Sequence, residues 1–117
     1  MGYESKLYVV DKHYWKWCNE SWGEVVASFD LCKVYNFDFK KYPPTDCYIY
    51  ADDGNTKIRE DNYGDPLREI PIKDMIQMLE EAIKTEDYYR RYQPCLSLLK
   101  GFNLDDWGNL VILHYGH

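Results

Sequence analysis

The sequence of 117 residues predicts one α+β domain spanning residues 1–117. Its two helices are expected to pack on one face of an antiparallel or mixed sheet of about five strands, in the order β-β-β-β-α-α-β. Three observations support this class. Residues 25–32 alternate apolar and polar side chains, as a half-buried strand does, and residues 52–55 form a hairpin-turn sequence. Residues 72–84 repeat apolar side chains at the spacing of an amphipathic helix.

The first two strands are expected in the N-terminal third of the chain. Residues 6–10, KLYVV, are rich in β-forming side chains, and residues 25–32 have one face much more apolar than the other. Between them, residues 13–22, HYWKWCNESW, hold three tryptophans without a clean period. We expect this segment either to cap the core or to form an exposed aromatic patch.

A loop and a hairpin follow in the middle of the chain. Residues 36–46 hold two adjacent prolines, which cannot donate to a ladder, and are expected to form an exposed connection. Residues 47–51 and 56–60 read as two strands joined by a turn in which Gly54 takes a positive φ. Residues 61–71 contain a second turn signal and are expected to end the sheet before the helices.

The last third of the chain predicts two helices and a final strand. The first helix covers residues 72–84, and Thr85 is expected to cap the second. Pro94 predicts a kink or a break in the second helix, and Gly101 predicts its end. Residues 110–113, LVIL, are apolar without alternation, which indicates a central strand that pairs with an early one.

Composition favours a protein partner over a nucleic acid. The net charge is −6, and residues 51–117 hold eight basic and thirteen acidic side chains. The electrostatic field of this negative charge repels phosphate backbones and disfavours direct nucleic-acid binding, whereas it attracts a basic protein surface. The simpler interpretation is that the negative charge serves only to keep the protein soluble. We expect no contact with a membrane, and a cytoplasmic location, because no apolar run is long enough to span a bilayer and residues 1–10 do not resemble a secretion signal.

The cysteines and histidines predict no metal site and no cofactor. The sequence has no C-x-x-C pair, so we expect small buried thiols at Cys18, Cys32, Cys47 and Cys95. A site built from His13, Cys18 and another cysteine is the alternative. His13 beside a carboxylate such as Glu20 is a second alternative, as an acid–base pair in a small enzyme. Nucleotide-binding and hydrolase motifs are absent from the sequence, and no catalytic residue is predicted.

Several acidic and aromatic side chains are candidates for partner binding. The turns of the middle segment would steer a basic partner, and exposed aromatic rings would anchor it. In the second helix, an arginine beside tyrosines offers a further side-chain pair that could anchor a partner. The candidate set is Asp52, Asp53, Glu60, Asp61, Tyr63, Asp65, Trp15, Trp17, Tyr89 and Arg90. Binding of Ca²⁺ or Mg²⁺ by the acidic turns is an alternative, although their spacing does not match an EF-hand.

Three segments carry a resemblance to known proteins. They are residues 1–10, MGYESKLYVV, residues 48–55, YIYADDGN, and residues 62–67, NYGDPL. Together they resemble the small, acidic, tyrosine-rich proteins encoded by bacteriophages and prophages. The resemblance implies a bacterial host cytoplasm and a role against host machinery that is carried out by binding.

The function we expect is therefore non-enzymatic protein binding. The chain would act as a phage-type accessory protein or inhibitor on a basic, nucleic-acid-handling host protein. Two alternatives stay open. One is a small enzyme or ligand-binding fold that uses His13 and nearby acids, and the other is a self-associating structural protein, such as a homodimer joined through its aromatic patch.

Overall fold

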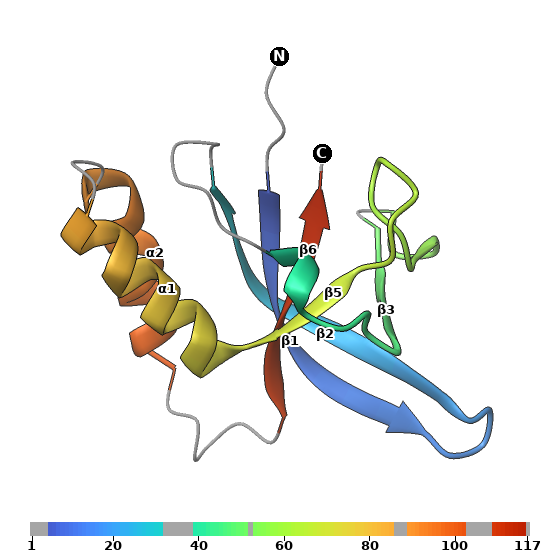
Figure 1. The fold of residues 1–117 in the computed structure, drawn as a ribbon. Helices are drawn as coiled ribbons and strands as arrows, with labels where there is room; N and C mark the ends of the chain where they lie inside the picture. Colours follow the sequence, from blue (N-terminus) through green and yellow to red (C-terminus); the bar gives the residue numbers. More distant parts are fainter. Residues whose placement is uncertain (1–4, 32–38, 52, 86–88, 103–108, 117) are drawn as a thin grey trace.

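A computed structural model of the chain describes residues 5–31, 39–51, 53–85, 89–102 and 109–116. It has a sheet with both helices at one side (Figure 1). The α+β class, the mixed sheet and the two helices are confirmed. In chain order the elements are β1 (Ser5–Trp15), β2 (Glu20–Leu31), the 3-10 helix η1 (Phe39–Lys41), β3 (Cys47–Tyr50), β4 (Lys57–Ile58), β5 (Arg68–Pro71), α1 (Ile72–Thr85), α2 (Tyr89–Lys100) and β6 (Leu110–Gly116).

The sheet has six strands in the order β4-β3-β2-β1-β6-β5. β1 pairs antiparallel with both β2 and β6, and β5 pairs antiparallel with β6. β3 joins β2 in parallel, with Ser21 opposite Cys47, so the sheet is mixed. The prediction that the apolar run 110–113 forms a central strand paired with an early one is confirmed, because β6 lies between β1 and β5.

The main core lies between the sheet and the two helices. Leu7 and Val9 of β1 point to this side together with Ile112 of β6, as the two-residue period of a strand requires. The helices contribute side chains at spacings of three and four residues. Their buried members are Ile72, Met75, Leu79 and Ala82 of α1 and Tyr92, Cys95, Leu96 and Leu99 of α2.

A second, smaller core lies among the strands away from the helices. It consists of Val10, Ile49, Leu67 and Leu113, all fully or almost fully buried. The register of β1 and β2 shifts between Val9 and Val10, so that a bulge separates the part of the hairpin beside the main core from the part beyond it. The sheet thus packs on both of its sides.

The strands differ from the predicted ones in number and length. The sequence-based count of about five strands was wrong by one, because β5 occupies the segment that we expected to end the sheet. Pro71 obscured this strand, but β5 is an edge strand, where a missing backbone donor is tolerated. The tryptophan-rich segment is also mostly strand: β1 continues to Trp15, and β2 begins at Glu20. Conversely, β4 covers only Lys57–Ile58 of the expected 56–60.

The helices and turns agree better with the sequence. Gly54 and Gly64 both have a positive φ, of 74° and 79°. α2 continues through Pro94 without a break, and it ends before Gly101, whose N–H donates to the carbonyl of Ser97 at 3.0 Å. Thr85 is the last residue of α1, and the expected first turn of the second helix at residues 86–88 lies outside the described residues.

The expectation of buried thiols is confirmed for two of the three cysteines that the structure describes and is wrong for Cys18. Cys47 and Cys95 are buried and form no disulfide, and burial raises the pKa of each. Cys18 is free and half-buried, and Cys32 lies outside the described residues.

Candidate functional site

The β1–β2 hairpin forms an arm that extends away from the helices (Figure 1). Its last pair is Trp15 opposite Glu20, and a four-residue turn closes it. Asn19 in that turn has a φ of 55°, a left-handed conformation that asparagine tolerates well. The hydroxyl of Tyr14 donates a hydrogen bond to Oδ1 of the same asparagine, so the turn is tied to β1.

Aromatic rings stack along one face of this arm. Residues 13 and 15 share a face of β1, and Trp22 lies opposite His13 on β2. The ring of Trp22 stacks on Trp15, with centroids 5.8 Å apart and planes at 6°, and on His13, at 4.8 Å and 25°. Trp17 extends the row beyond Trp15, at 6.3 Å, and Tyr50 lies beside Trp22, at 6.4 Å. We call these five rings the aromatic row.

Much of the aromatic row is exposed. The exposed fraction is 82% for Trp17, 40% for Trp15 and 41% for Tyr50. The expectation of a segment that either caps the core or forms an exposed patch is therefore resolved in favour of the patch. An exposed group of large apolar side chains on one protrusion is typical of a contact surface.

Tyr48 lies edge-on beside Tyr50 of the row and contacts a small group of charged side chains on β4 and its flank. Lys57 Nζ and the Arg59 guanidinium lie over the ring of Tyr48, at 4.5 Å and 4.9 Å. Glu20 pairs with both, at 3.1 Å to Lys57 and 3.6 Å to Arg59. The hydrogen bond from Lys57 to Glu20 raises the pKa of the lysine. Glu20 therefore neutralises these cations and is not the carboxylate beside His13.

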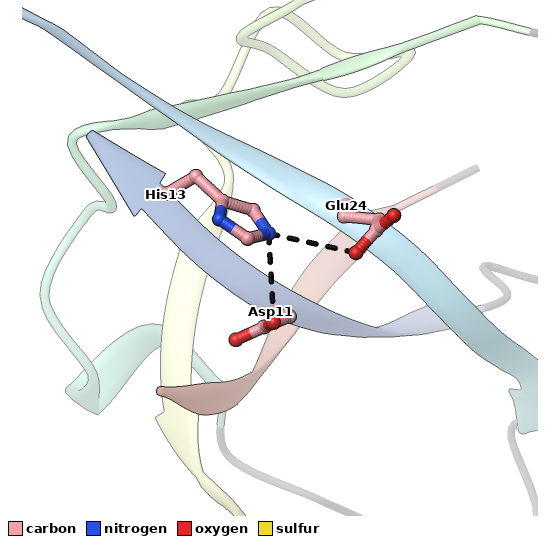
Figure 2. A group of neighbouring side chains, drawn as sticks. All are labelled: Asp11, His13 and Glu24. Atoms are coloured by element: carbon pink, nitrogen blue, oxygen red, sulfur yellow. Dashed lines mark ion pairs between the residues drawn. The ribbon is translucent and has the colours of Figure 1, made fainter. Parts of the chain in front are cut away.

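His13 instead faces two other carboxylates (Figure 2). Its Nε2 lies 3.5 Å from Oδ2 of Asp11 and 3.5 Å from Oε1 of Glu24. Asp11 and His13 are two residues apart on β1, and Glu24 is the cross-strand partner of Asp11. The backbone N–H of Asn109 donates to the other oxygen of Asp11 at 3.3 Å. The alternative site with Cys18 is not formed, because the Cys18 thiol contacts the Trp15 carbonyl and Glu20.

A second group of carboxylates contains its own cation. Lys12 Nζ lies 3.0 Å from Glu69 and 3.4 Å from Asp46, next to the buried thiol of Cys47. Burial lowers the pKa of Lys12, but the hydrogen bond to Glu69 and the charges around it raise the pKa by more. Burial likewise opposes ionisation of Asp46, yet Lys12 holds the pKa of that carboxyl below its usual value.

The acidic turns of the candidate set have a local structural role. Asp53 accepts hydrogen bonds from the N–H groups of Asn55 and Thr56, both at 2.8 Å, and from the Thr56 hydroxyl. Asp61 accepts bonds from the N–H groups of Tyr63 and Asp65, at 2.8 and 3.0 Å. These carboxylates add to the negative charge of the surface, but each already accepts hydrogen bonds within its own turn.

The other candidates are divided between exposed side chains and undescribed ones. Glu60, Tyr63 and Asp65 are exposed, and Tyr63 is exposed by 58%. Asp52 and the side chains of Tyr89 and Arg90 lie outside the described residues.

Sequence reasoning missed several members of the site. Trp22 and Tyr50 were not singled out, nor were Asp11 and Glu24. The spacing of Asp11, His13 and Trp15 at every second residue is a signal for one strand face, but only the register of the hairpin brings Glu24 and Trp22 to that face. That register was not deducible while the segment lacked a clean period.

Two shallow grooves border the described strands. One, of about 360 Å³, is lined by residues that include Tyr8, Val25 and Tyr115. The other, of about 390 Å³, lies beside the start of α1 and includes Tyr42 and Pro71. His13 lines neither of these two grooves.

Comparison with known protein families, curated proteins and solved structures finds no match. Within the described part of the chain, no helix has both the length and the apolar character that a bilayer span requires.

Proposed function

We propose that this protein is a non-enzymatic protein-binding domain that docks through the aromatic row of the hairpin arm. Its partner is a protein with a basic surface, and a nucleic-acid-handling host protein in the bacterial cytoplasm is the expected target. The chain would thus act as a phage-type accessory protein or inhibitor. The single observation that carries the proposal is the exposure of Trp15 and Trp17 side by side at the end of the arm.

The physical argument rests on the area that these rings leave in water. Burying a tryptophan at an interface removes a large apolar area from solvent with little loss of rotamer entropy. Stacking of Trp15 on Trp22 holds its ring in place before binding, which lowers the entropic cost of association. Rigid, preformed aromatic anchors of this kind are the residues that dominate binding energy in interfaces.

The sign of the partner's charge follows from the charge of the chain. The net charge is −6, and Asp11 and Glu24 border the aromatic row. Glu60 and Asp65 are exposed on the turn beside Tyr63. Complementary charge accelerates encounter and makes affinity depend on salt.

The test is affinity capture from bacterial lysate at low and raised salt, followed by measurement of Kd with the purified partner. Trp17→Ala combined with Trp15→Ala should weaken binding at least about a hundredfold, as loss of a hot spot does. Leu98→Ala is the matched control, because Leu98 is an exposed apolar side chain on α2, away from the arm. Equal Kd values for the double variant and the wild type would refute the proposed surface.

A charge test needs side chains that do not support their own turns. Replacing Asp53 or Asp61 would disturb local structure, so Glu60→Gln with Asp65→Asn is the better pair. This pair of substitutions should weaken binding modestly and flatten the dependence of log Kd on salt concentration.

A homodimer through the aromatic row is distinguished by light scattering, since its apparent mass would increase with protein concentration.

The second candidate function is a small enzyme or ligand-binding fold centred on His13. The position of Nε2 at 3.5 Å from two carboxylates favours it, because acid–base chemistry needs such a neighbourhood. Protein binding is the preferred proposal, because the exposed tryptophans Trp15 and Trp17 favour a contact surface directly.

A further inference from the structure

Two groups of metal-ligating side chains occur among the described residues. One is Asp11, His13 and Glu24, and the other is Asp46, Cys47 and Glu69. Within each group the potential ligand atoms all lie within 4.8 Å of one another. The two groups differ in how their negative charge is balanced, and that difference indicates which of them can take an ion.

The Asp46 group is already neutralised by a side chain. The ammonium group of Lys12 lies 3.4 Å from Asp46 and 3.0 Å from Glu69, in the position that a bound cation would need. A metal ion would have to displace this ammonium group and break two ion pairs. We therefore assign no metal to this group.

The Asp11 group lacks such a cation. Among the described residues, no lysine or arginine lies within 4.0 Å of Asp11 or Glu24, and the imidazole of His13 is charged only when protonated. Two carboxylates thus converge on one ring nitrogen. A divalent cation between the three groups would offset the repulsion between the carboxylates and would use the nitrogen as a ligand.

We propose that Asp11, His13 and Glu24 form a three-ligand binding site for a divalent transition metal ion, with Zn²⁺ as the best fit. Zinc–nitrogen and zinc–oxygen bonds of about 2.1 Å in a tetrahedral arrangement place neighbouring ligand atoms about 3.4 Å apart. Nε2 of His13 lies 3.5 Å from Oδ2 of Asp11 and from Oε1 of Glu24. Both separations fit a tetrahedral site, and the ligand oxygens of the two carboxylates lie within 4.8 Å of each other.

The surroundings of the site hold two ligands and leave the third adjustable. The ring of Trp22 stacks on His13 and fixes the plane of the imidazole. The N–H of Asn109 holds one oxygen of Asp11, so the other faces His13. The Glu24 side chain is 53% exposed and can move to close the site around an ion.

The ligand set selects the class of ion. One imidazole nitrogen with two carboxylate oxygens suits zinc and neighbouring transition metals, whereas Ca²⁺ and Mg²⁺ prefer oxygen ligands only. Three protein ligands leave the fourth tetrahedral position for water or an external ligand. His13 is 42% exposed, so an ion can reach the site from solvent.

The test is titration of the purified full chain, without a histidine tag, with Zn²⁺ in a calorimeter and with Co²⁺ by visible absorption. We expect one ion per chain and a cobalt spectrum typical of four-coordinate geometry. Glu24→Gln and His13→Gln should each weaken Zn²⁺ binding at least about tenfold. Glu24 is exposed, so we expect Glu24→Gln to stay folded, and circular dichroism verifies this. If His13→Gln does not fold, the Zn²⁺ affinity of Glu24→Gln alone tests the proposal.

Three control variants separate this site from other zinc ligands in the chain. Asp46→Asn removes a carboxylate from the Lys12-neutralised group and should leave Zn²⁺ affinity unchanged. Cys18→Ser and His117→Gln should also leave it unchanged. The proposal is overturned if the wild type takes up no Zn²⁺ at millimolar concentration, if Glu24→Gln binds as tightly as the wild type, or if either the Cys18 or the His117 variant abolishes binding.

Discussion

Lys12 Nζ lies 3.0 Å from Glu69 Oε1, and this contact joins β1 to β5, which β6 separates in the sheet order. Thr45 donates a further hydrogen bond to the same glutamate oxygen at 3.0 Å. The contact therefore ties β1, β5 and the residues before β3 together at a point where only about a quarter of each ionic side chain is exposed.

We expect Lys12→Met to destabilise the protein by about 1–2 kcal/mol, since it leaves partly buried carboxylates without their charged donor. The pKa of Lys12 is raised in the folded state, so its contribution is fully present below pH 10.5 and is lost as the pH rises through the higher folded-state value. Urea denaturation of Lys12→Met and the wild type measures the difference in the free energy of unfolding. Lys16→Met, in the exposed turn of the arm, serves as the control and should leave the unfolding midpoint unchanged.

His114 provides a test at acid pH. Its side chain is buried and stacks on Phe39 at 4.5 Å. Burial lowers its pKa from 6.5 to about 4, with Asp61 opposing and Arg68 adding to the shift. The unfolded chain therefore binds a proton between these pH values that the folded chain does not, and stability falls as the pH decreases from 6.5 to about 4.

The His114 contribution to this loss is about 3 kcal/mol at most. His114→Phe keeps a ring beside Phe39 and removes the titration, so the free energy of unfolding should depend less on pH between 6.5 and 4. Thermal or urea unfolding at several pH values measures this slope. An unchanged slope would show that other groups cause the acid sensitivity.

Gly23 lies where the arm meets the second core. A Cβ atom there would lie 3.1 Å from Cβ of Val10 and 3.3 Å from Cγ2 of Ile49. Both neighbours are fully buried and cannot move freely. We expect Gly23→Ala to destabilise the protein by about 1 kcal/mol or more, because overpacking outweighs the reduced entropy of the unfolded chain. Chemical denaturation measures it, and Ser28→Ala at an exposed β2 position should change little.

Asp53 is expected to act locally. The Thr56 hydroxyl and then the N–H groups of Thr56 and Asn55 lower its pKa to about 2, so its contribution is present above pH 3.8 and disappears as the pH falls through about 2. Asp53→Ala should speed amide hydrogen exchange at Asn55 and Thr56. Asp65→Ala is the matched control, since among the described residues no donor bonds to the Asp65 carboxylate. Equal protection of Asn55 and Thr56 in both variants would contradict this role.

The sequence predicted the elements with regular patterns. α1 has a strong helical period, the turn at Gly54 has its glycine at the required position, and the apolar run of β6 indicated a central strand. β5 was missed because four residues ending in Pro71 give no clear period. Local patterns therefore identified the elements with a clear period, turn glycine or apolar run, and not the short edge strand.

The site was less predictable for a different reason. Trp15, Trp17 and His13 were singled out as residues, but their arrangement depends on which residue of β2 lies opposite each of them. That pairing comes from the four-residue turn after Trp15, which places Glu20 opposite Trp15 and keeps one register back to Val10, and the irregular sequence of the segment does not indicate where the turn falls. Glu20 was therefore the example given of a carboxylate beside His13, whereas the register brings Glu24 to that position.

The position of β6 between β1 and β5 also determines the order of events during synthesis. Leu7 lies opposite His114, so the central ladder of the sheet joins residues from distant parts of the sequence. Such non-local contacts slow the folding reaction, because a long loop must close before they form. A nascent chain that has emerged from the ribosome only as far as α2 holds β1 with one open edge, which is the stage at which aggregation or chaperone binding competes with folding.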